Sequence, residues 1–187
     1  MITKVFFAVI SAVMLSSLST SMAQASETFS CGNGATYTIT DGVVGSGGGC
    51  SGAVTLNSKA IKIGQYAFYG SQVTSLTVPN SVTEFDWGAF YYMPALKTIN
   101  ISNSVTTIAR SAFTYTPLTS IIVDPTNQYF SSVDGVLFNK DRTELVKFPS
   151  GKDASTWSIP SGVTTINGYA FDGVDSLVNL VIPEGVT

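Results

Sequence analysis

Three pairs of carboxylates are the side chains whose types and spacing could perform catalysis. Two carboxylic acids on either side of a bound sugar can cleave a glycosidic bond, one as general acid and the other as base or nucleophile. The pairs fall in expected turns or in an irregular segment, where solvated acids are usual, and they are Glu84 with Asp86, Asp134 with Asp141, and Asp172 with Asp175. The chain has no histidine, so it cannot build a Ser-His-Asp or Cys-His relay or the usual imidazole metal site. We therefore expect no catalytic residue, no cofactor and no metal site, and a carbohydrate-active enzyme is the weakest function considered.

The two cysteines, Cys31 and Cys50, are the other candidates for chemistry. Their spacing is not Cys-x-x-Cys and no histidine can complete a metal site, which favours a disulfide over a redox or metal pair. They bracket a glycine-rich stretch, and closing a loop of this size stabilises by about 3 kcal/mol in the chain-entropy model. We expect residues 26–52 to form a disulfide-bonded N-terminal cap.

The N-terminal segment has the order of a secretory signal. Lys4 precedes a mostly apolar run from Val5 to Leu18, and small residues follow at Ala23 and Ala25. This order predicts a signal peptide over residues 1–25, cleaved after Ala25, and the apolar run is short for a membrane span. The protein is thus expected to be secreted or at the cell surface, with the periplasm as a further option. No other segment is apolar for long enough to cross a bilayer, so no stable membrane insertion is expected once the signal is removed.

A sequence repeat over residues 53–187 defines the elements that must position any site. The doublet Ala-Phe ends at Phe68, Phe90, Phe113 and Phe171, and the first three follow at steps of 22 and 23 residues. Each repeat begins with a short run of apolar residues at every second position, which is typical of a strand with one buried face. These strands are expected to end near Leu56, Val78, Ile101, Val123, Ile159 and Ile182. A proline or serine corner, a second short strand and the Ala-Phe box complete the unit.

Repeats of this length cannot bury their apolar face alone, so they must stack on one another as a solenoid. The pattern L-x-x-I-x-I-P-x-x-V-T-x-I-x-x-x-A-F, with the insert YFSSVDGVLFNKDRTELVKFPSG, resembles the BspA-like leucine-rich-repeat family of bacterial and some protozoan surface proteins. The resemblance implies an α/β, mainly β, solenoid with parallel strands and short helical turns. It also implies a secreted or surface-attached adhesive protein that binds extracellular proteins or glycans, and no catalytic residue belongs to the family pattern.

One repeat departs from the pattern. The unit that begins at Val123 has no Ala-Phe box and carries an insert at about residues 129–150. Its apolar halves, residues 136–138 and 144–148, flank a polar turn, which predicts a β-hairpin that projects from or widens one coil. The sequence stops at residues 182–187, where a further repeat would start. We expect either a fragment of a longer protein or an uncapped C-terminal coil that pairs end to end with a partner.

Two surfaces are candidates for binding. Side chains that point out of the main sheet form a row of small, mostly uncharged groups, among them Thr77, Asn100 and Ile122. The second candidate is a ridge of aromatic residues around the Ala-Phe boxes, since tyrosine and tryptophan are enriched at interface hot spots. The ridge comprises Tyr66, Tyr69, Trp87, Tyr91, Tyr92, Tyr115 and Tyr169.

The charge of the chain narrows the choice of partner. The net charge is −3 and the basic residues are scattered, which argues against nucleic acid because no stripe of positive charge could neutralise phosphates. An extracellular protein or glycan is the expected partner. A structural spacer or scaffold within a larger surface protein is the alternative.

Overall fold

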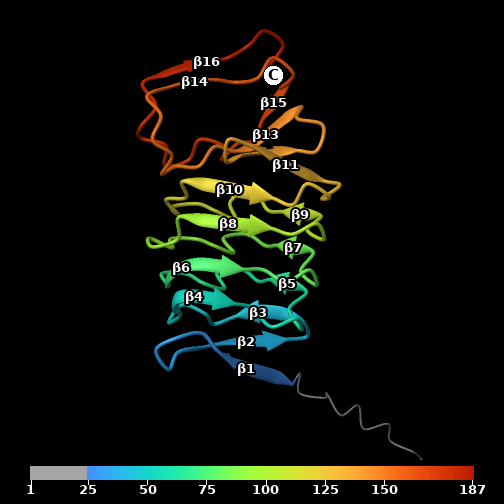
Figure 1. The fold of residues 1–187 in the computed structure, drawn as a ribbon, viewed down its shortest axis with the longest axis vertical. Helices are drawn as coiled ribbons and strands as arrows, with labels where there is room; N and C mark the ends of the chain where they lie inside the picture. The colour runs from blue at the N-terminus through green and yellow to red at the C-terminus, as the bar shows by residue number, and fades with distance from the viewer. Residues whose placement is uncertain (1–24) are drawn as a thin grey trace, which may run out of the picture.

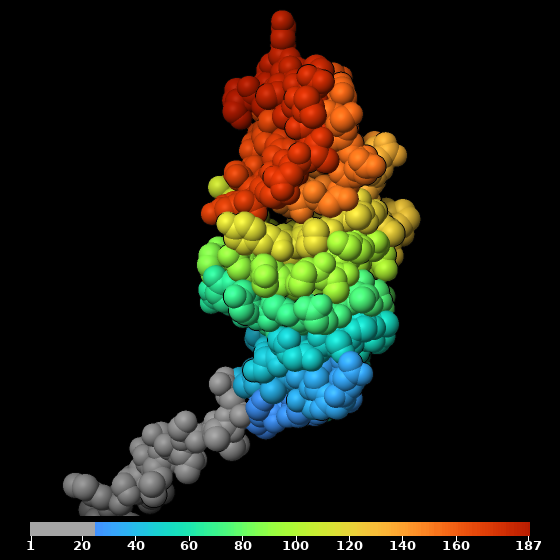
Figure 2. Space-filling view, turned by 90° about the vertical axis from the view of Figure 1, so that its left-hand side faces the viewer, coloured from blue at the N-terminus to red at the C-terminus, as the bar shows by residue number. Residues whose placement is uncertain are grey.

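The structure, a computed structural model, describes residues 25–187, which form coils stacked along one long axis (Figure 1). Each coil appears as a colour band across that axis in the space-filling view of Figure 2. The predicted signal peptide, apart from Ala25, lies outside the described residues. One side of the stack is a parallel sheet in the order β10-β8-β6-β4. Its strands are β4 (Ser51–Thr55), β6 (Gln72–Thr77), β8 (Thr98–Ile101) and β10 (Ser120–Val123). Beyond the insert, β14 (Thr156–Ser158) pairs in parallel with β16 (Asn179–Val181).

The second short strand of each repeat lies on another side of the stack. These strands are β5 (Lys62–Ile63), β7 (Glu84–Phe85) and β9 (Thr107–Ile108), and each pairs in parallel with the next. The N-terminal cap extends this second sheet through the antiparallel strands β1 (Ser26–Ser30), β2 (Thr36–Thr40) and β3 (Val43–Gly45). The predicted disulfide is confirmed, because Cys31 and Cys50 are bonded to each other within residues 26–52.

The Ala-Phe boxes are tight turns, whereas short helical turns were expected. No helix occurs within residues 25–187. In the first box, Ala67 N–H donates to Gly64 O at 3.2 Å and Tyr69 N–H donates to Tyr66 O at 3.1 Å. A right-handed helix cannot continue here because Tyr66 (φ 53°) and Gly70 (φ 72°) are in the left-handed region. The first two boxes are therefore chains of turns interrupted twice, and the third and fourth are interrupted once, at Tyr115 and Gly173.

The box phenylalanines fill the core between the two sheets. Phe68 and Phe90 are fully buried, and the rings of Phe90 and Phe113 stack with centroids 5.5 Å apart. The ring of Phe85 meets that of Phe90 edge to face at 5.0 Å. This column of rings gives successive coils a common apolar interior, as the repeat predicted.

The insert is a three-stranded antiparallel sheet packed within the stack. Its strands are β11 (Phe130–Val133), β12 (Val136–Asn139) and β13 (Glu144–Lys147), and β13 also pairs in parallel with β15 (Thr165–Ile166). Alternate residues face opposite ways, since Leu137 belongs to the N-terminal core and Phe138 to the C-terminal one. The predicted hairpin therefore exists, and it widens a coil because both of its faces are buried.

Candidate functional site

One of the acid pairs considered for catalysis is held in an ion-pair network. Lys62 Nζ lies 2.8 Å from Glu84 Oε1 and 2.9 Å from Asp86 Oδ2. The hydrogen bonds with Glu84 and with Asp86 raise the pKa of Lys62, so the lysine stays charged between them. This arrangement links two neighbouring coils and engages both carboxylates in ion pairs with the lysine. Within residues 25–187, no group of three or more His, Cys, Asp or Glu side chains is arranged to hold a metal ion.

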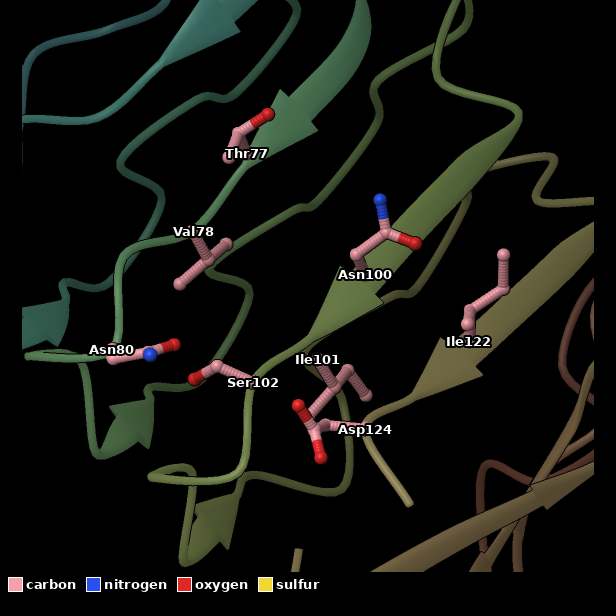
Figure 3. Close-up of a pocket in the computed structure, with 8 residues that line it drawn as sticks. All are labelled: Thr77, Val78, Asn80, Asn100, Ile101, Ser102, Ile122 and Asp124. Atoms are coloured by element: carbon pink, nitrogen blue, oxygen red, sulfur yellow. The ribbon is translucent and has the colours of Figure 1, made fainter. Parts of the chain in front are cut away.

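The predicted row of outward residues lies on the exposed face of the main sheet. The register pairs Thr77 with Asn100 and Asn100 with Ile122, so these three residues occupy the same position on β6, β8 and β10. Figure 3 shows them side by side on neighbouring strands. Ile122 is 49% exposed, which is unusual for an isoleucine in a sheet.

A shallow groove crosses this row near the ends of the strands. It has a volume of about 260 Å³, and polar side chains missed by sequence reasoning complete it (Figure 3). Its lining residues are Thr77, Val78, Asn80, Asn100, Ile101, Ser102, Ile122 and Asp124. Hydrogen bonds from the side chain and backbone of Thr126 lower the pKa of Asp124, so this acid is ionised at neutral pH. The groove combines hydrogen-bonding groups with the aliphatic side chains of Val78, Ile101 and Ile122.

The aromatic cluster is the more developed of the two surfaces. We use this name for six members of the predicted ridge: Tyr66, Tyr69, Trp87, Tyr91, Tyr92 and Tyr115. Tyr66 is central, with its ring perpendicular to those of Trp87 at 4.8 Å and Tyr91 at 5.4 Å. Edge-to-face contacts of this kind stabilise by about 0.5–1.5 kcal/mol each, so the rings are held in place by one another. The cluster spans three successive coils.

The cluster is open to solvent and borders two hollows. Tyr66, Tyr69 and Tyr91 line a hollow of about 500 Å³. A second one of about 440 Å³ is lined by Tyr92, Pro94, Tyr115, Pro117, Ser150, Gly173 and Asp175. Tyr69 is 54% exposed and Tyr115 is 59% exposed. Burial against its neighbours raises the pKa of Tyr91, so its hydroxyl is protonated at neutral pH and can donate a hydrogen bond.

Three tyrosines of the cluster have a left-handed backbone. The φ angles are 53° at Tyr66, 53° at Tyr92 and 55° at Tyr115. Two other boxes have glycine at the position of Tyr92 and Tyr115. These glycines are Gly70 and Gly173, and each has a φ of 72°. A bulky residue in this region is strained by about 1–2 kcal/mol relative to glycine. The interchange of tyrosine and glycine between repeats is a sequence signal that could have revealed these positions.

Tyr169, the seventh residue of the predicted ridge, makes no ring contact with the cluster. It is 43% exposed and lies in the last box, where its carbonyl oxygen accepts a hydrogen bond from Lys147 Nζ at 3.1 Å. The widened coil separates this box from the other three along the axis. The structure thus brings together six of the seven aromatic residues and leaves Tyr169 apart.

The fold and this open surface define a leucine-rich-repeat protein. The chain belongs to the family of BspA type leucine rich repeat regions, whose model matches six copies over residues 49–143 and 147–187. The expected family resemblance is therefore confirmed. No curated protein gives a significant match. Within residues 25–187, there is no helix with the length and apolar character needed to span a membrane.

Solved structures of bacterial proteins share the fold. The pneumococcal vaccine antigen PcpA is 30% identical with a TM-score of 0.69, over 73% of this chain and 35% of that protein. A leucine rich cell surface protein from Faecalibacterium prausnitzii is 26% identical with a TM-score of 0.63, over 73% of this chain and 36% of that one. A leucine-rich repeat protein from Eubacterium ventriosum is 24% identical with a TM-score of 0.55, over 87% of this chain and 61% of that protein. This similarity shows the fold alone. The chain thus spans from about a third to three fifths of the length of these relatives.

Proposed function

We propose that this chain is an exported recognition protein, secreted or held at the cell surface, that binds an extracellular protein or glycan through the aromatic cluster. The observation that carries the proposal is the group of six aromatic side chains at the surface, five of them exposed and three with a strained, left-handed backbone. Exposed aromatic groups of this size are costly for a soluble protein unless they meet a partner. The predicted signal peptide and the cell-surface relative from Faecalibacterium support the location.

The aromatic cluster is favoured over the polar groove for a physical reason. Burial of an aromatic side chain contributes more binding free energy than burial of small polar groups, whose hydrogen bonds to water must first be broken. The groove of Thr77, Asn100 and Ile122 is the second candidate surface for the same function. Neither surface presents a pair of unengaged carboxylates facing a hollow, so the enzyme alternative has no observation in its favour.

A binding screen tests the proposal. Residues 26–187 are exported, purified and applied to arrays of extracellular-matrix proteins, mucins and glycans. We expect binding that is lost when Tyr69 and Tyr91 are both replaced by serine and that is kept when Tyr169 is replaced by serine. Binding that survives the double replacement but is lost with Asn100→Ala and Ile122→Ala would move the function to the groove. No binding to any array would favour the structural spacer.

Pairing through the C-terminal coil stays a separate prediction. Strand β16 is exposed along its length, and Val181 and Ile182 are each 55% exposed. Light scattering over a range of concentrations would detect end-to-end association. A change of Val181 to Glu should abolish that association and leave binding to the arrays intact.

A further inference from the structure

Three rings of the aromatic cluster form a row, one on each of three successive coils. Tyr69 and Tyr91 both follow the box phenylalanine directly, and their rings are nearly parallel with centroids 5.8 Å apart. The ring of Tyr115, two residues after its box phenylalanine, lies 5.4 Å from that of Tyr91 and is perpendicular to it at 87°. Tyr66 stands perpendicular to Tyr69 and Tyr91 at 80° and 88° and forms the back of the hollow. A polymer lying along this row would meet one ring per coil.

The spacing of the rings excludes the common extended peptides as matching occupants. A polyproline II helix has three residues per turn, so contacts on one side recur about every 9 Å. A β-strand presents side chains on one face about every 7 Å. Neither period matches the observed 5.4–5.8 Å. The length of one sugar residue in an extended polysaccharide is the nearer match, because it is close to the spacing of neighbouring coils, about 4.8 Å, and so stays in step with one ring per coil.

The chemistry of the row also matches a sugar. Within the described part of the chain, no hydrogen bond engages the hydroxyls of Tyr66, Tyr69 and Tyr91, which line the hollow. A pyranose ring has C–H groups on its faces and hydroxyls on its rim, so it can stack on a tyrosine and hydrogen-bond to a phenol at once.

The charge around the row argues for a neutral ligand. Among the residues that the structure describes, only tyrosines line the first hollow, and Asp175 lies in the second. Asp172 is close enough to contribute to the raised pKa of Tyr91. With a net charge of −3, the chain would repel uronic or sulfated polysaccharides at this surface.

We infer that the row Tyr69, Tyr91, Tyr115, backed by Tyr66, binds a neutral, extended polysaccharide with one sugar residue per coil. This inference rests on the proposed recognition function and names its ligand class. The left-handed backbone of Tyr66 and Tyr115 supports the inference independently. Glycine at either position would relieve the strain, so a tyrosine there costs stability and supplies a ring of the site in return.

The test uses barley β-glucan, xylan and galactomannan, with hyaluronan as the charged control. Affinity electrophoresis measures retardation of residues 26–187, and titration with the matching oligosaccharides measures affinity as a function of length. We expect affinity to rise with oligosaccharide length and to level off once three coils are covered. Tyr91→Ala should weaken binding about tenfold, which corresponds to about 1.4 kcal/mol. Tyr115→Gly, which removes a ring without adding backbone strain, should also weaken binding, whereas Tyr169→Ala should leave it unchanged.

The possible results distinguish a wrong ligand class from a wrong proposed function. The fluorescence of Trp87, whose ring lies 4.8 Å from that of Tyr66, should change when a neutral oligosaccharide binds. Failure to bind any of the neutral polysaccharides, with cluster-dependent binding to an extracellular-matrix protein, would overturn this inference and retain the proposed function. Retardation that is equal for the wild type and Tyr91→Ala, or retardation by hyaluronan, would also overturn it. An absence of binding on every array would overturn the proposed function itself.

Discussion

Gly88 leaves the space that the ring of Tyr66 occupies. A Cβ atom added at Gly88 would lie 2.8 Å from Cε1 and 2.9 Å from Cδ1 of Tyr66. Gly88 occupies in the second box the position that Tyr66 occupies in the first, and both have a left-handed backbone. Glycine at this position in the second coil therefore leaves room for the ring of Tyr66 from the first coil. Two tyrosines at this position in successive coils would collide.

Replacement of Gly88 by alanine should destabilise the protein by roughly 2 kcal/mol, since the left-handed backbone strains any L side chain and the ring must move. The change in the free energy of unfolding is measured by denaturant titration, and the near-ultraviolet circular dichroism of the cluster should change with it. Gly168→Ala is the matched control, because a Cβ there meets no atom within 4 Å and Gly168 is not left-handed. Equal stability of the two variants would contradict the role of Gly88.

Tyr115 should be held in its left-handed conformation at a cost to stability. Because φ is 55° and the side chain is 59% exposed, little packing is lost when the ring is removed. We expect Tyr115→Gly to be more stable than Tyr115→Ala by about 1 kcal/mol, the difference between glycine and alanine in this region. Thermal unfolding of both variants measures this difference. Equal stability of the two variants would show that residue 115 is not left-handed in solution.

The disulfide should contribute substantially to the stability of the N-terminal cap. Cys31 and Cys50 are both buried and are separated by 19 residues. Replacing both by alanine removes a loop constraint from the unfolded chain and should lower the free energy of unfolding by about 3 kcal/mol. Hydrogen exchange should show the loss concentrated in β1 and β2. Alkylation without reductant should leave the mass of the wild type unchanged.

The stacking of coils could be predicted from the sequence because it follows from regular patterns. Alternating apolar residues such as Leu96, Ile99 and Ile101 specify a strand with one buried face, and their recurrence specifies the stack. The gathering of the aromatic cluster was also predictable, since its members flank the same box in successive repeats.

The rest depends on contacts that the pattern does not encode. Phe148, at the end of the insert, takes the place of a box phenylalanine: its N–H donates to Ala170 O at 2.9 Å, as Phe90 N–H donates to Ala112 O at 2.8 Å. The insert shifts this residue out of the repeat spacing, so the sequence alone did not assign it to the column. The local motif of Tyr169 places it in the predicted ridge, although the widened coil separates it from the others.

Asn127 should be the residue that anchors the insert. It is fully buried where other repeats have Val82, Val105 or Val163. Its Nδ2 donates to Ser102 O at 2.8 Å and to Val105 O at 2.9 Å, and its Oδ1 accepts from the backbone N–H groups of residues 129 and 130 at 2.7 and 2.8 Å.

Asn127→Val would leave those buried backbone groups without partners, at about 1–3 kcal/mol each, so we expect a loss of roughly 3 kcal/mol after relaxation. Gln128→Val, one residue further on and exposed, should change the free energy of unfolding by less than about 0.5 kcal/mol. Comparable losses for the two variants in denaturant titrations would contradict the role of Asn127.

Lys147 should make stability depend on pH. Its side chain is buried, and its Nζ donates to Tyr169 O at 3.1 Å and to Asp172 O at 2.9 Å. Burial lowers the pKa of Lys147 to about 8, although the charge of Asp172 opposes the shift. Because the folded-state pKa is below that of the unfolded chain, the unfolded state binds more protons between about pH 8 and pH 10.5, and the free energy of unfolding rises with pH in that window.

The rise should amount to about 3 kcal/mol, since each pKa unit corresponds to about 1.4 kcal/mol. In Lys147→Met this contribution disappears, so the free energy of unfolding should depend less on pH. The loss of two hydrogen bonds changes its absolute value but not this dependence. Lys97→Met, at an exposed lysine, should keep the slope of the wild type. Denaturant titrations at intervals from pH 7 to about pH 10.5 measure the three profiles. A wild-type slope retained in Lys147→Met would show that the ammonium group of Lys147 remains charged and solvated in the folded protein.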